Sequence, residues 1–480
     1  MSESVYRGAT SLPPEVWSRV FHLLPPKSLH VLLNTDPYFH PLVIPFIRSA
    51  VNWSCYFDFI SDYLQFWVAQ YPGCTSAVRS ATIGRIGRSR RLWQEEMAWD
   101  FGVALPILST FSNIRVLSLL NVRYPAHDLP SHFASLPNLR EAHFMFYNGL
   151  CSDATAESIS FPVLRSILPP LDYLEVRGLS PIQSTERRGC SIHAGLAAMA
   201  VLSCLPSLRI LDVDLDSWDS LAAGRASLLP PTSLPAGLQQ VSLFRDAPKD
   251  ATAPVYSKDW GDNFLVELST TTLSLLRLHV VLGVQVLLSA AASTLVLPSL
   301  VEFIGPHHFL PFLAFPHTLQ TLWVTTLNID TPSEWSLSSA FPSSSIPLSL
   351  QSFALLEWEP FGTSFSDILS LSPDVSEISL SLAGSSCLSE EDLLGYGSVL
   401  ARSSITHLTL LGCDLSGSMM ERIVLGWKES QPLLVEVRLS ASLCWSWGGG
   451  RLTTSRLDRV QPSVPTKYDV VYRLNSRHSL

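Results

Sequence analysis

The side chains best able to bind or react lie beside short apolar stretches that recur along the chain. Carboxylates, imidazoles and a phenol at such places could hold an amine or a cation, and an indole could anchor a protein partner. The candidate contact residues are Glu141, His143, Asp172, Tyr173, Glu175, Asp212, Trp323 and His407, with Arg438 at a similar place. Their acidic bias favours a basic or amine-bearing partner surface. The alternative is that they are exposed strand residues that contact only water.

No catalytic pattern accompanies these residues. The chain has no G-x-S-x-G, no H-E-x-x-H and no P-loop, so hydrolase, metalloprotease and nucleotide-binding interpretations have no basis. Two groups of metal-binding residue types lack ligand spacing, and we interpret them as loop or core residues. They are His307, His308 and His317, and Cys190, His193 and Cys204. We expect a protein that is not an enzyme and has neither a cofactor nor a metal site.

Composition limits the class of protein. Of 480 residues, 47% are hydrophobic and 15% are charged, which is enough apolar material for a large core. A formal net charge of −9 argues against nucleic acid as a partner, because phosphate binding needs clustered Lys and Arg. Eight cysteines without a C-x-x-C pair, and a start without a secretory signal pattern, indicate reduced thiols and a cytoplasmic and/or nuclear location.

One uncharged segment is long enough to cross a bilayer. No charged residue occurs between Leu278 and Val301, and about 20 apolar residues suffice for a spanning helix. However, His279, Gln285 and Pro298 interrupt the segment, and the usual aromatic and basic anchors do not flank it. We interpret it as a buried strand followed by a buried helix and expect no membrane partner. A membrane-attached protein is the alternative.

A pattern of the form apolar-x-x-apolar-x-apolar recurs after residue 110. The successive copies begin about 29 residues apart, near the upper end of the spacing of leucine-rich repeats. They begin at Ile114, Leu139, Leu171, Leu208, Leu238, Leu273, Leu300, Leu319, Leu350, Val375, Ile405 and Leu434. The last two apolar positions of each copy are two residues apart and therefore share one face of a strand. One such strand cannot bury its own apolar face, whereas stacked copies form a continuous core.

Helical patterns separate several of these strands. They are AGLAAMAVLSCL before Leu208, DNFLVELSTT before Leu273, EEDLLGYGSVLARS before Ile405 and GSMMERIVLGWKES before Leu434. The alternation predicts an α/β fold with a parallel sheet. Residues 106–440 resemble a leucine-rich repeat array of about twelve irregular repeats, and this resemblance implies a curved solenoid, or horseshoe. The copy from Ile405 matches the full consensus through Cys413, whose expected role is structural. An ordinary α/β core is the alternative.

The first fifty residues form a different pattern. Pro13 and Pro14 suit the first turn of a helix, and Pro25 and Pro26 end that helix and begin the next. Apolar residues recur every three or four positions in three short segments, which predicts three amphipathic helices. About forty residues cannot bury so much apolar surface among themselves. The segment therefore either binds another protein or packs as a cap on the rest of this chain.

This segment resembles the F-box, whose pattern begins L-P-x-E-(I/V). The resemblance implies that it docks on a Skp-family adaptor and, through the adaptor, joins a cullin-RING ligase. The residues that the resemblance assigns to the adaptor contact are Leu12, Pro13, Glu15, Val16, Val20, Phe21, Leu24 and Leu29. The chain departs from the family in its second half, where NTDPYF has Pro37 and lacks the usual Arg, and Phe39 stands in for the usual aromatic residue.

These patterns predict five regions. Residues 1–10 form a disordered N-terminus, 11–50 the F-box, 51–105 a helical linker, 106–440 the repeat array and 441–480 a C-terminal extension with a further strand at YDVVYRL. The order of F-box and repeats resembles the substrate receptors of Skp–cullin–F-box ubiquitin ligases, which implies a non-catalytic subunit with an unknown protein target. The alternative is a repeat scaffold without a role in ubiquitin transfer.

Overall fold

The computed structural model describes most of the predicted elements. The described residues are 12–35, 38–55, 60–85, 107–122, 133–146, 166, 168–177, 200–227, 233–245, 264–268, 274–282, 295–314, 318–325, 350–358, 365–371, 374–382, 388–413, 415–440, 443–448 and 451–456. The chain divides into two compact units, Met1–Pro235 and Ala236–Leu480. We describe each unit by itself.

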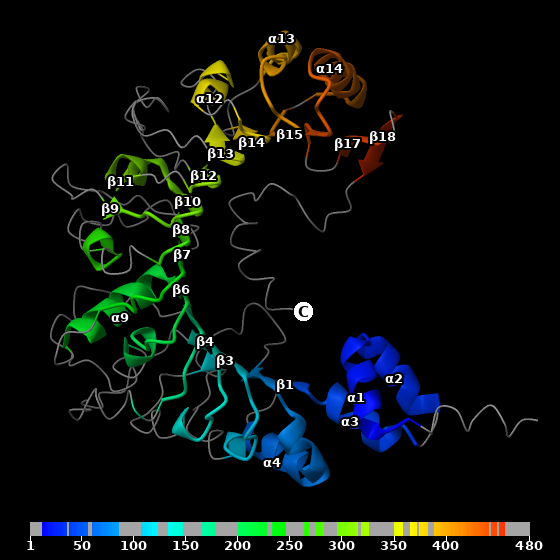
Figure 1. Ribbon diagram of the computed structural model, residues 1–480, viewed down its shortest axis with the longest axis vertical. Coiled ribbons are helices and arrows are strands. Elements are labelled where there is room, and N and C mark those ends of the chain that lie inside the picture. Colours follow the sequence, from blue (N-terminus) through cyan, green and yellow to red (C-terminus); the bar gives the residue numbers. More distant parts are fainter. Residues whose placement is uncertain are drawn as a thin grey trace, which may run out of the picture. The chain divides into compact units, whose positions relative to one another are not determined.

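Three short helices open the first unit, as the proline pattern predicts. They are α1 (Pro14–Leu23), α2 (Pro26–Thr35) and α3 (His40–Ile47), drawn in blue in Figure 1. Their shared core contains Phe21, Leu29, Phe39 and Val43. The ring of Trp17 packs edge-on against Phe39, with centroids 4.8 Å apart. The three helices therefore have a small core of their own.

Parallel strands follow in chain order. In the first unit they are β1 (Ala50–Cys55), β2 (Ser80–Arg85), β3 (Val116–Val122), β4 (Glu141–Phe146), β5 (Tyr173–Arg177) and β6 (Ile210–Asp214), with α4 (Ile60–Gln70), the 3-10 helix η1 (Pro72–Ala77) and α9 (Leu215–Ser227) between or after them. Each of these strands pairs with the next one along the chain. This arrangement confirms the prediction of a parallel α/β fold at the level of the sheet.

The predicted helical linker, residues 51–105, contains strands as well as a helix. Helix α4 lies there, but β1 and β2 also lie there and extend the sheet. Trp53 and Ile83 are buried at paired positions of the two strands. The sequence pattern missed these strands because their inward residues include Ala81 and Trp53 in place of leucines.

The second unit continues with parallel strands and ends in an antiparallel hairpin. Its sheet contains β7 (Gln240–Arg245), β8 (Arg277–Leu282), β10 (Glu302–Pro306), β12 (Thr321–Thr325), β13 (Ser352–Trp358), β14 (Glu377–Leu382), β15 (His407–Leu411), β16 (Glu436–Arg438), β17 (Leu443–Gly448) and β18 (Arg451–Arg456). A short separate pair is formed by β9 (Leu295–Val296) and β11 (Leu313–Ala314), with the 3-10 helix η3 (His307–Phe312) before β11. The antiparallel strands β17 and β18 lie in the predicted C-terminal extension, whereas YDVVYRL lies outside the described residues.

Helices cover one side of the later strands. Figure 1 shows α12 (Phe365–Leu371), α13 (Glu390–Leu400) and α14 (Gly417–Ser430) on the same side of β13, β14 and β15. The last two lie where the sequence predicts helices. The indole of Trp427 is fully buried and donates a hydrogen bond to the carbonyl of Leu393, at 2.6 Å. This bond fixes α14 against α13.

The inward apolar residues of the strands form the core of each unit. At one level of the first unit, Leu117, Ala142, Leu174 and Leu211 align across β3–β6 and are all fully buried. Burial of a leucine side chain typically contributes about 1.5–3 kcal/mol. Because the strands stack in chain order, the inward side chains of neighbouring strands pack beside one another and form a continuous core.

The register predicted for the copy at Leu273 is wrong by two residues. Leu275, Leu278 and Val280 are fully buried, and Val241 of β7 aligns with Leu278 of β8. The copy therefore begins at Leu275. Both LSLLRL and LLRLHV satisfy the pattern, and a shift of two residues leaves the inward face unchanged, so the sequence alone does not distinguish the two registers.

The membrane alternative concerns the uncharged segment between Leu278 and Val301. No helix in the described ranges is both long enough and apolar enough to span a bilayer. The first part of the uncharged segment forms strand β8, as the interpretation as a buried strand predicts. The helix predicted to follow it falls on residues 283–294, outside the described residues.

Candidate functional site

A group of polar residues lies across β4, β5 and β6 at positions that alternate with the core. We call it the β4–β6 cluster, and it consists of Glu141, His143, Tyr173, Glu175, Arg177 and Asp212. The register aligns His143 with Glu175 and Asp212, and aligns Glu141 with Tyr173. Parallel pairing without a shift therefore brings five of the eight predicted contact residues onto one face of the sheet.

The members of the β4–β6 cluster contact one another closely. His143 Nδ1 lies 2.8 Å from Glu175 Oε2, and the Arg177 guanidinium forms an ion pair with the same carboxylate. The Tyr173 hydroxyl donates a hydrogen bond to Asp212 Oδ2 at 2.7 Å. His143, Glu175 and Asp212 are only 5%, 6% and 4% exposed. The expectation of exposed residues that contact only water is therefore wrong for these positions.

The phenol of Tyr173 stays protonated in this setting and donates a hydrogen bond to Asp212. Burial raises its pKa well above the ordinary value, and the neighbouring carboxylates of Asp212 and Glu175 raise the pKa further, whereas Arg177 lowers it. A phenol with so high a pKa stays protonated at neutral pH and cannot serve as a base. The buried members of the β4–β6 cluster thus contact one another within the sheet, and Glu141 is its exposed charged member.

The other three predicted contact residues lie elsewhere. Asp172 precedes β5, and its backbone carbonyl accepts hydrogen bonds from the N–H groups of Arg209 and Ile210. Trp323 on β12 and His407 on β15 belong to the second unit. The indole of Trp323 donates to the Ser352 hydroxyl at 3.4 Å. Asp172 thus lies beside Tyr173 at the start of β5, whereas Trp323 and His407 are described with the second unit.

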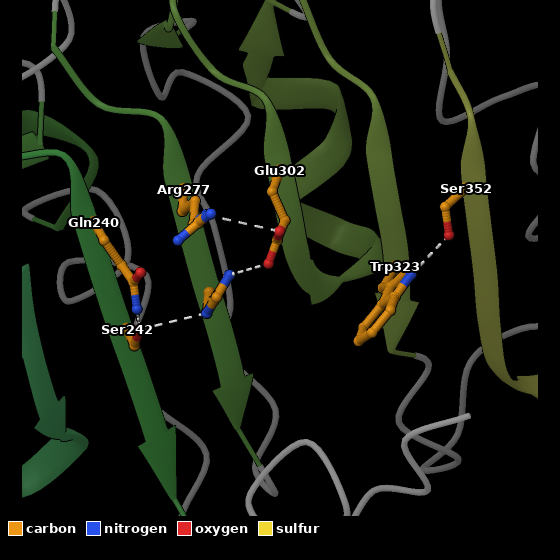
Figure 2. A network of polar contacts seen from close by, with 7 residues as sticks. Gln240, Ser242, Arg277, Glu302, Trp323 and Ser352 are labelled. Carbon is orange, nitrogen blue, oxygen red and sulfur yellow. Dashed lines mark hydrogen bonds and ion pairs between the residues drawn. The ribbon is translucent and has the colours of Figure 1, made fainter. Parts of the chain in front are cut away.

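A second polar group, which sequence reasoning missed, crosses β7, β8 and β10. We call it the β7–β10 cluster, and Figure 2 shows how its labelled members point toward one another from neighbouring strands. It consists of Gln240, Ser242, Arg277, His279 and Glu302. The wrong register at Leu273 hid it, since that copy ends at Leu278 and leaves His279 outside the pattern. The corrected register places Arg277 and His279 at the two polar-face positions.

One chain of hydrogen bonds connects the β7–β10 cluster. Gln240 Nε2 donates to Ser242 Oγ at 3.1 Å, Ser242 Oγ lies 3.4 Å from His279 Nδ1, and His279 Nε2 lies 2.6 Å from Glu302 Oε1. Arg277 Nε lies 3.9 Å from the other oxygen of Glu302. In the neutral imidazole, Nε2–H donates to Glu302 and Nδ1 accepts from Ser242, so every contact has a donor and an acceptor.

Hydroxyl, imidazole and carboxylate in this order also occur in hydrolase triads. A nucleophile must reach its substrate, but Ser242 has no exposed surface. Its oxygen already accepts a hydrogen bond from Gln240. We therefore interpret the group as a structural connection between three strands.

Helix α1 has two apolar stripes. Trp17, Phe21 and Leu24 recur at helical spacing and face the core of the three helices. Val16, Val20 and Leu23 form the other stripe, in which Val16 is 40% exposed and Leu23 is 85% exposed. The sequence does not show which stripe faces its own core, because both have the same period.

The predicted adaptor-contact residues divide between these two environments. Leu12, Pro13, Glu15 and Val16 are exposed, and Val20 and Leu24 are half-buried. Phe21 and Leu29 are 1% and 5% exposed, so the prediction that they contact an adaptor is wrong for this arrangement. Their side chains instead hold the three helices together. The exposed apolar residues that we group as the α1–α2 surface are Leu12, Val16, Leu23 and Val31.

The structure describes only part of the two groups of metal-binding residue types found in the sequence. The described residues contain no group of His, Cys, Asp and Glu that could hold a metal ion. Cys413 is buried next to Gly412, whose φ of 93° favours glycine. Cys190 and His193 lie outside the described residues.

Neither a comparison with protein-family models nor one with curated proteins finds a match for this chain.

Proposed function

We propose that this protein is the non-catalytic substrate receptor of a Skp–cullin–F-box ubiquitin ligase. In this role residues 11–50 form an F-box that binds the adaptor, and the strands from β3 onward belong to a leucine-rich repeat array, a horseshoe that binds a target protein. Other subunits carry out the transfer. The receptor acts by holding a target lysine near the conjugating enzyme, which raises the effective concentration of that lysine.

The observation that carries the proposal is the α1–α2 surface. The three helices use one stripe of α1 for their own core and leave another apolar stripe exposed. Leu23 is 85% exposed and Val31 is 60% exposed, and exposed apolar side chains on amphipathic helices suit a protein interface. An amphipathic helix that keeps its own fold and presents a second apolar face is suited to a protein partner.

Two further features support the repeat part of the proposal. Apart from the C-terminal hairpin, the strands of the main sheet run parallel in chain order within each unit, as stacked repeats require. The β4–β6 cluster places several charged side chains on one face across three strands. Its exposed member, Glu141, would contribute specificity toward a target of complementary charge.

The test is adaptor capture with point variants of the intact chain. Val16→Glu with Leu23→Glu should abolish co-purification with a Skp-family adaptor, because two charges would be buried at the interface. Leu394→Glu with Leu425→Glu is the matched control, since these residues are 41% and 43% exposed on α13 and α14. The control should bind as the wild type does.

The outcomes separate the two candidate roles. If the wild-type chain does not capture the adaptor, or the variant at Val16 and Leu23 captures it as well as the control does, the receptor proposal is wrong. A repeat scaffold without a role in ubiquitin transfer would then be the better description. Circular dichroism checks that both variants remain folded, so a loss of capture reflects the surface itself.

A further inference from the structure

Arginines occupy the position directly before several strands of the first unit. Arg79 precedes β2, Arg115 precedes β3, Arg140 precedes β4 and Arg209 precedes β6. We call these four residues the arginine row, and all four are exposed. The chain as a whole carries a net charge of −9. The row is therefore a local concentration of positive charge on an acidic protein.

Backbone hydrogen bonds set the spacing of the row. The N–H of Arg115 donates to the carbonyl of Arg79 at 2.7 Å, and the N–H of Arg140 donates to the carbonyl of Arg115 at 2.8 Å. The next two steps pass through Asp172 to Arg209 in the same way. Adjacent strands lie about 4.8 Å apart, so three arginines begin three successive strands at that interval.

Within the described residues, the four guanidinium groups of the arginine row form no ion pairs with acids. Arg79 donates to the carbonyl of Ser76 at 2.8 Å and Arg140 to that of Pro170 at 3.0 Å. Like charges at neighbouring positions of adjacent strands destabilise a sheet. An external anion would relieve this repulsion.

We propose that the arginine row binds an acidic segment of a partner protein. Guanidinium groups bind carboxylates and phosphates through paired hydrogen bonds, and evenly spaced groups suit an extended segment with repeated acids. Asp172 interrupts the row after three strands, and Glu141 lies beside Arg140 in sequence. These carboxylates limit the uninterrupted positive run to three strands, which matches a short acidic stretch of protein better than the long, evenly charged backbone of nucleic acid. The proposal does not depend on the adaptor.

The test measures anisotropy of a dye-labelled heptaglutamate peptide with the full chain in 50 mM salt. A peptide in which phosphoserine replaces three of the glutamates distinguishes a phosphorylated from a carboxylate source, and heptaglutamine is the uncharged probe. Arg115→Gln with Arg140→Gln should weaken binding of the acidic peptides about tenfold. Arg402→Gln with Arg422→Gln removes the same charge from exposed sites in the second unit and should change binding less than about twofold.

Three results would overturn the proposal. The first is that the wild-type chain binds neither acidic peptide more tightly than heptaglutamine. The second is an equal loss in the two double variants, which would mean that binding follows net charge alone. The third is an oligouridylate of equal charge that displaces the peptides more strongly than unlabelled peptide does. Thermal unfolding of each variant checks that the first unit remains folded.

Discussion

At the scale of single residues, the candidate site is more buried and more interconnected than polar strand positions usually are. The His143, Glu175 and Asp212 side chains contact neighbours on adjacent strands and expose less than a tenth of their surface. A buried carboxylate needs its donors, because a lost partner leaves desolvated charge behind. Contacts within the β4–β6 cluster therefore contribute to the stability of β4, β5 and β6.

The Tyr173 hydroxyl is the first such contact to test. Tyr173→Phe removes the hydrogen bond to Asp212 and should lower the free energy of local opening of β5 and β6 by about 1–2 kcal/mol. Hydrogen exchange of the amides in these strands measures the effect. Tyr71→Phe is the control, because the ring of Tyr71 contacts Arg48 through its face. Equal protection in both variants would show that the Tyr173 bond adds no stability.

At the scale of elements, β10 belongs to the irregular copy of the apolar pattern that begins at Leu300. It shows how the core is filled where glycine replaces an apolar side chain. Gly305 occupies an inward position of β10, and Val324 occupies the aligned position of β12. The ring of Phe303 fills the space, since a Cβ added to Gly305 would lie 2.7 Å from its Cζ. The sequence pattern loses its final apolar residue here, yet the volume of the core is maintained.

This packing predicts that a smaller side chain at position 303 restores stability lost by a larger one at position 305. Gly305→Ala should destabilise the second unit by about 1–3 kcal/mol, because the new methyl group overlaps a buried ring. Adding Phe303→Leu should recover a large part of that loss by making room. Thermal unfolding measures both variants. Gly395→Ala, with nothing within 4 Å of the added Cβ, is the control and should be neutral or stabilising. No recovery in the double variant would contradict the packing argument.

Helix α13 begins with a reciprocal cap. The Ser389 hydroxyl accepts from the N–H of Asp392, and the Asp392 carboxylate accepts from the N–H of Ser389 at 3.0 Å. The Ser389 hydroxyl and backbone N–H lower the pKa of Asp392. A pKa below the unfolded value means that the stabilisation is complete above about pH 4 and is lost as the pH falls through the lowered pKa.

Ser389→Ala should therefore cost about 1 kcal/mol at pH 7. The difference from the wild type should shrink at pH 3, because the protonated carboxyl accepts these bonds poorly. Hydrogen exchange of the α13 amides at the two pH values measures the change. Ser398→Ala, within the same helix, is the control. A difference of the same size at both pH values would show that the carboxylate contributes nothing to the cap.

The sequence predicts the strands well where leucines mark the inward positions, and poorly where other residues do so. Most copies from Ile114 to Leu434 begin where the pattern places them, because each needs buried side chains at fixed intervals. Trp53 and Ala81 serve the same purpose without matching the pattern. His279 was missed through a two-residue ambiguity that only pairing with β7 resolves. The burial of Phe21 depends on which stripe of α1 the other two helices cover, and this is a tertiary contact.

At the scale of the whole molecule, the two kinds of basic residue are used very unequally. The chain has 27 arginines and five lysines, and no lysine occurs between Lys27 and Lys249. Arginine keeps its charge at all physiological pH values and is a poor nucleophile, whereas lysine carries an amine that can be modified. The arginine row thus supplies charge to the first unit without supplying amines.

Of the two lysines within the described residues, only Lys27 is exposed. Lys428 donates to the carbonyls of Pro432 and Leu434 at 2.7 and 2.6 Å, and its ammonium lies 5.0 Å from the centre of the Trp447 ring. Acetic anhydride at limiting concentration should therefore modify Lys27 several times faster than Lys428, as peptide mass spectrometry can measure. Trp447→Leu should raise the rate at Lys428 alone. Equal rates in the wild type would show that these contacts do not protect the amine.

The contacts of Lys428 have a consequence for the proposed receptor. A ubiquitin ligase modifies lysine amines that come close to the conjugating enzyme. A substrate receptor with many accessible amines would therefore compete with its own target protein. Here the ammonium at the end of α14 is held by two carbonyls and an indole face. In the proposed receptor, the amine of Lys428 would therefore compete less with the lysines of a bound target protein.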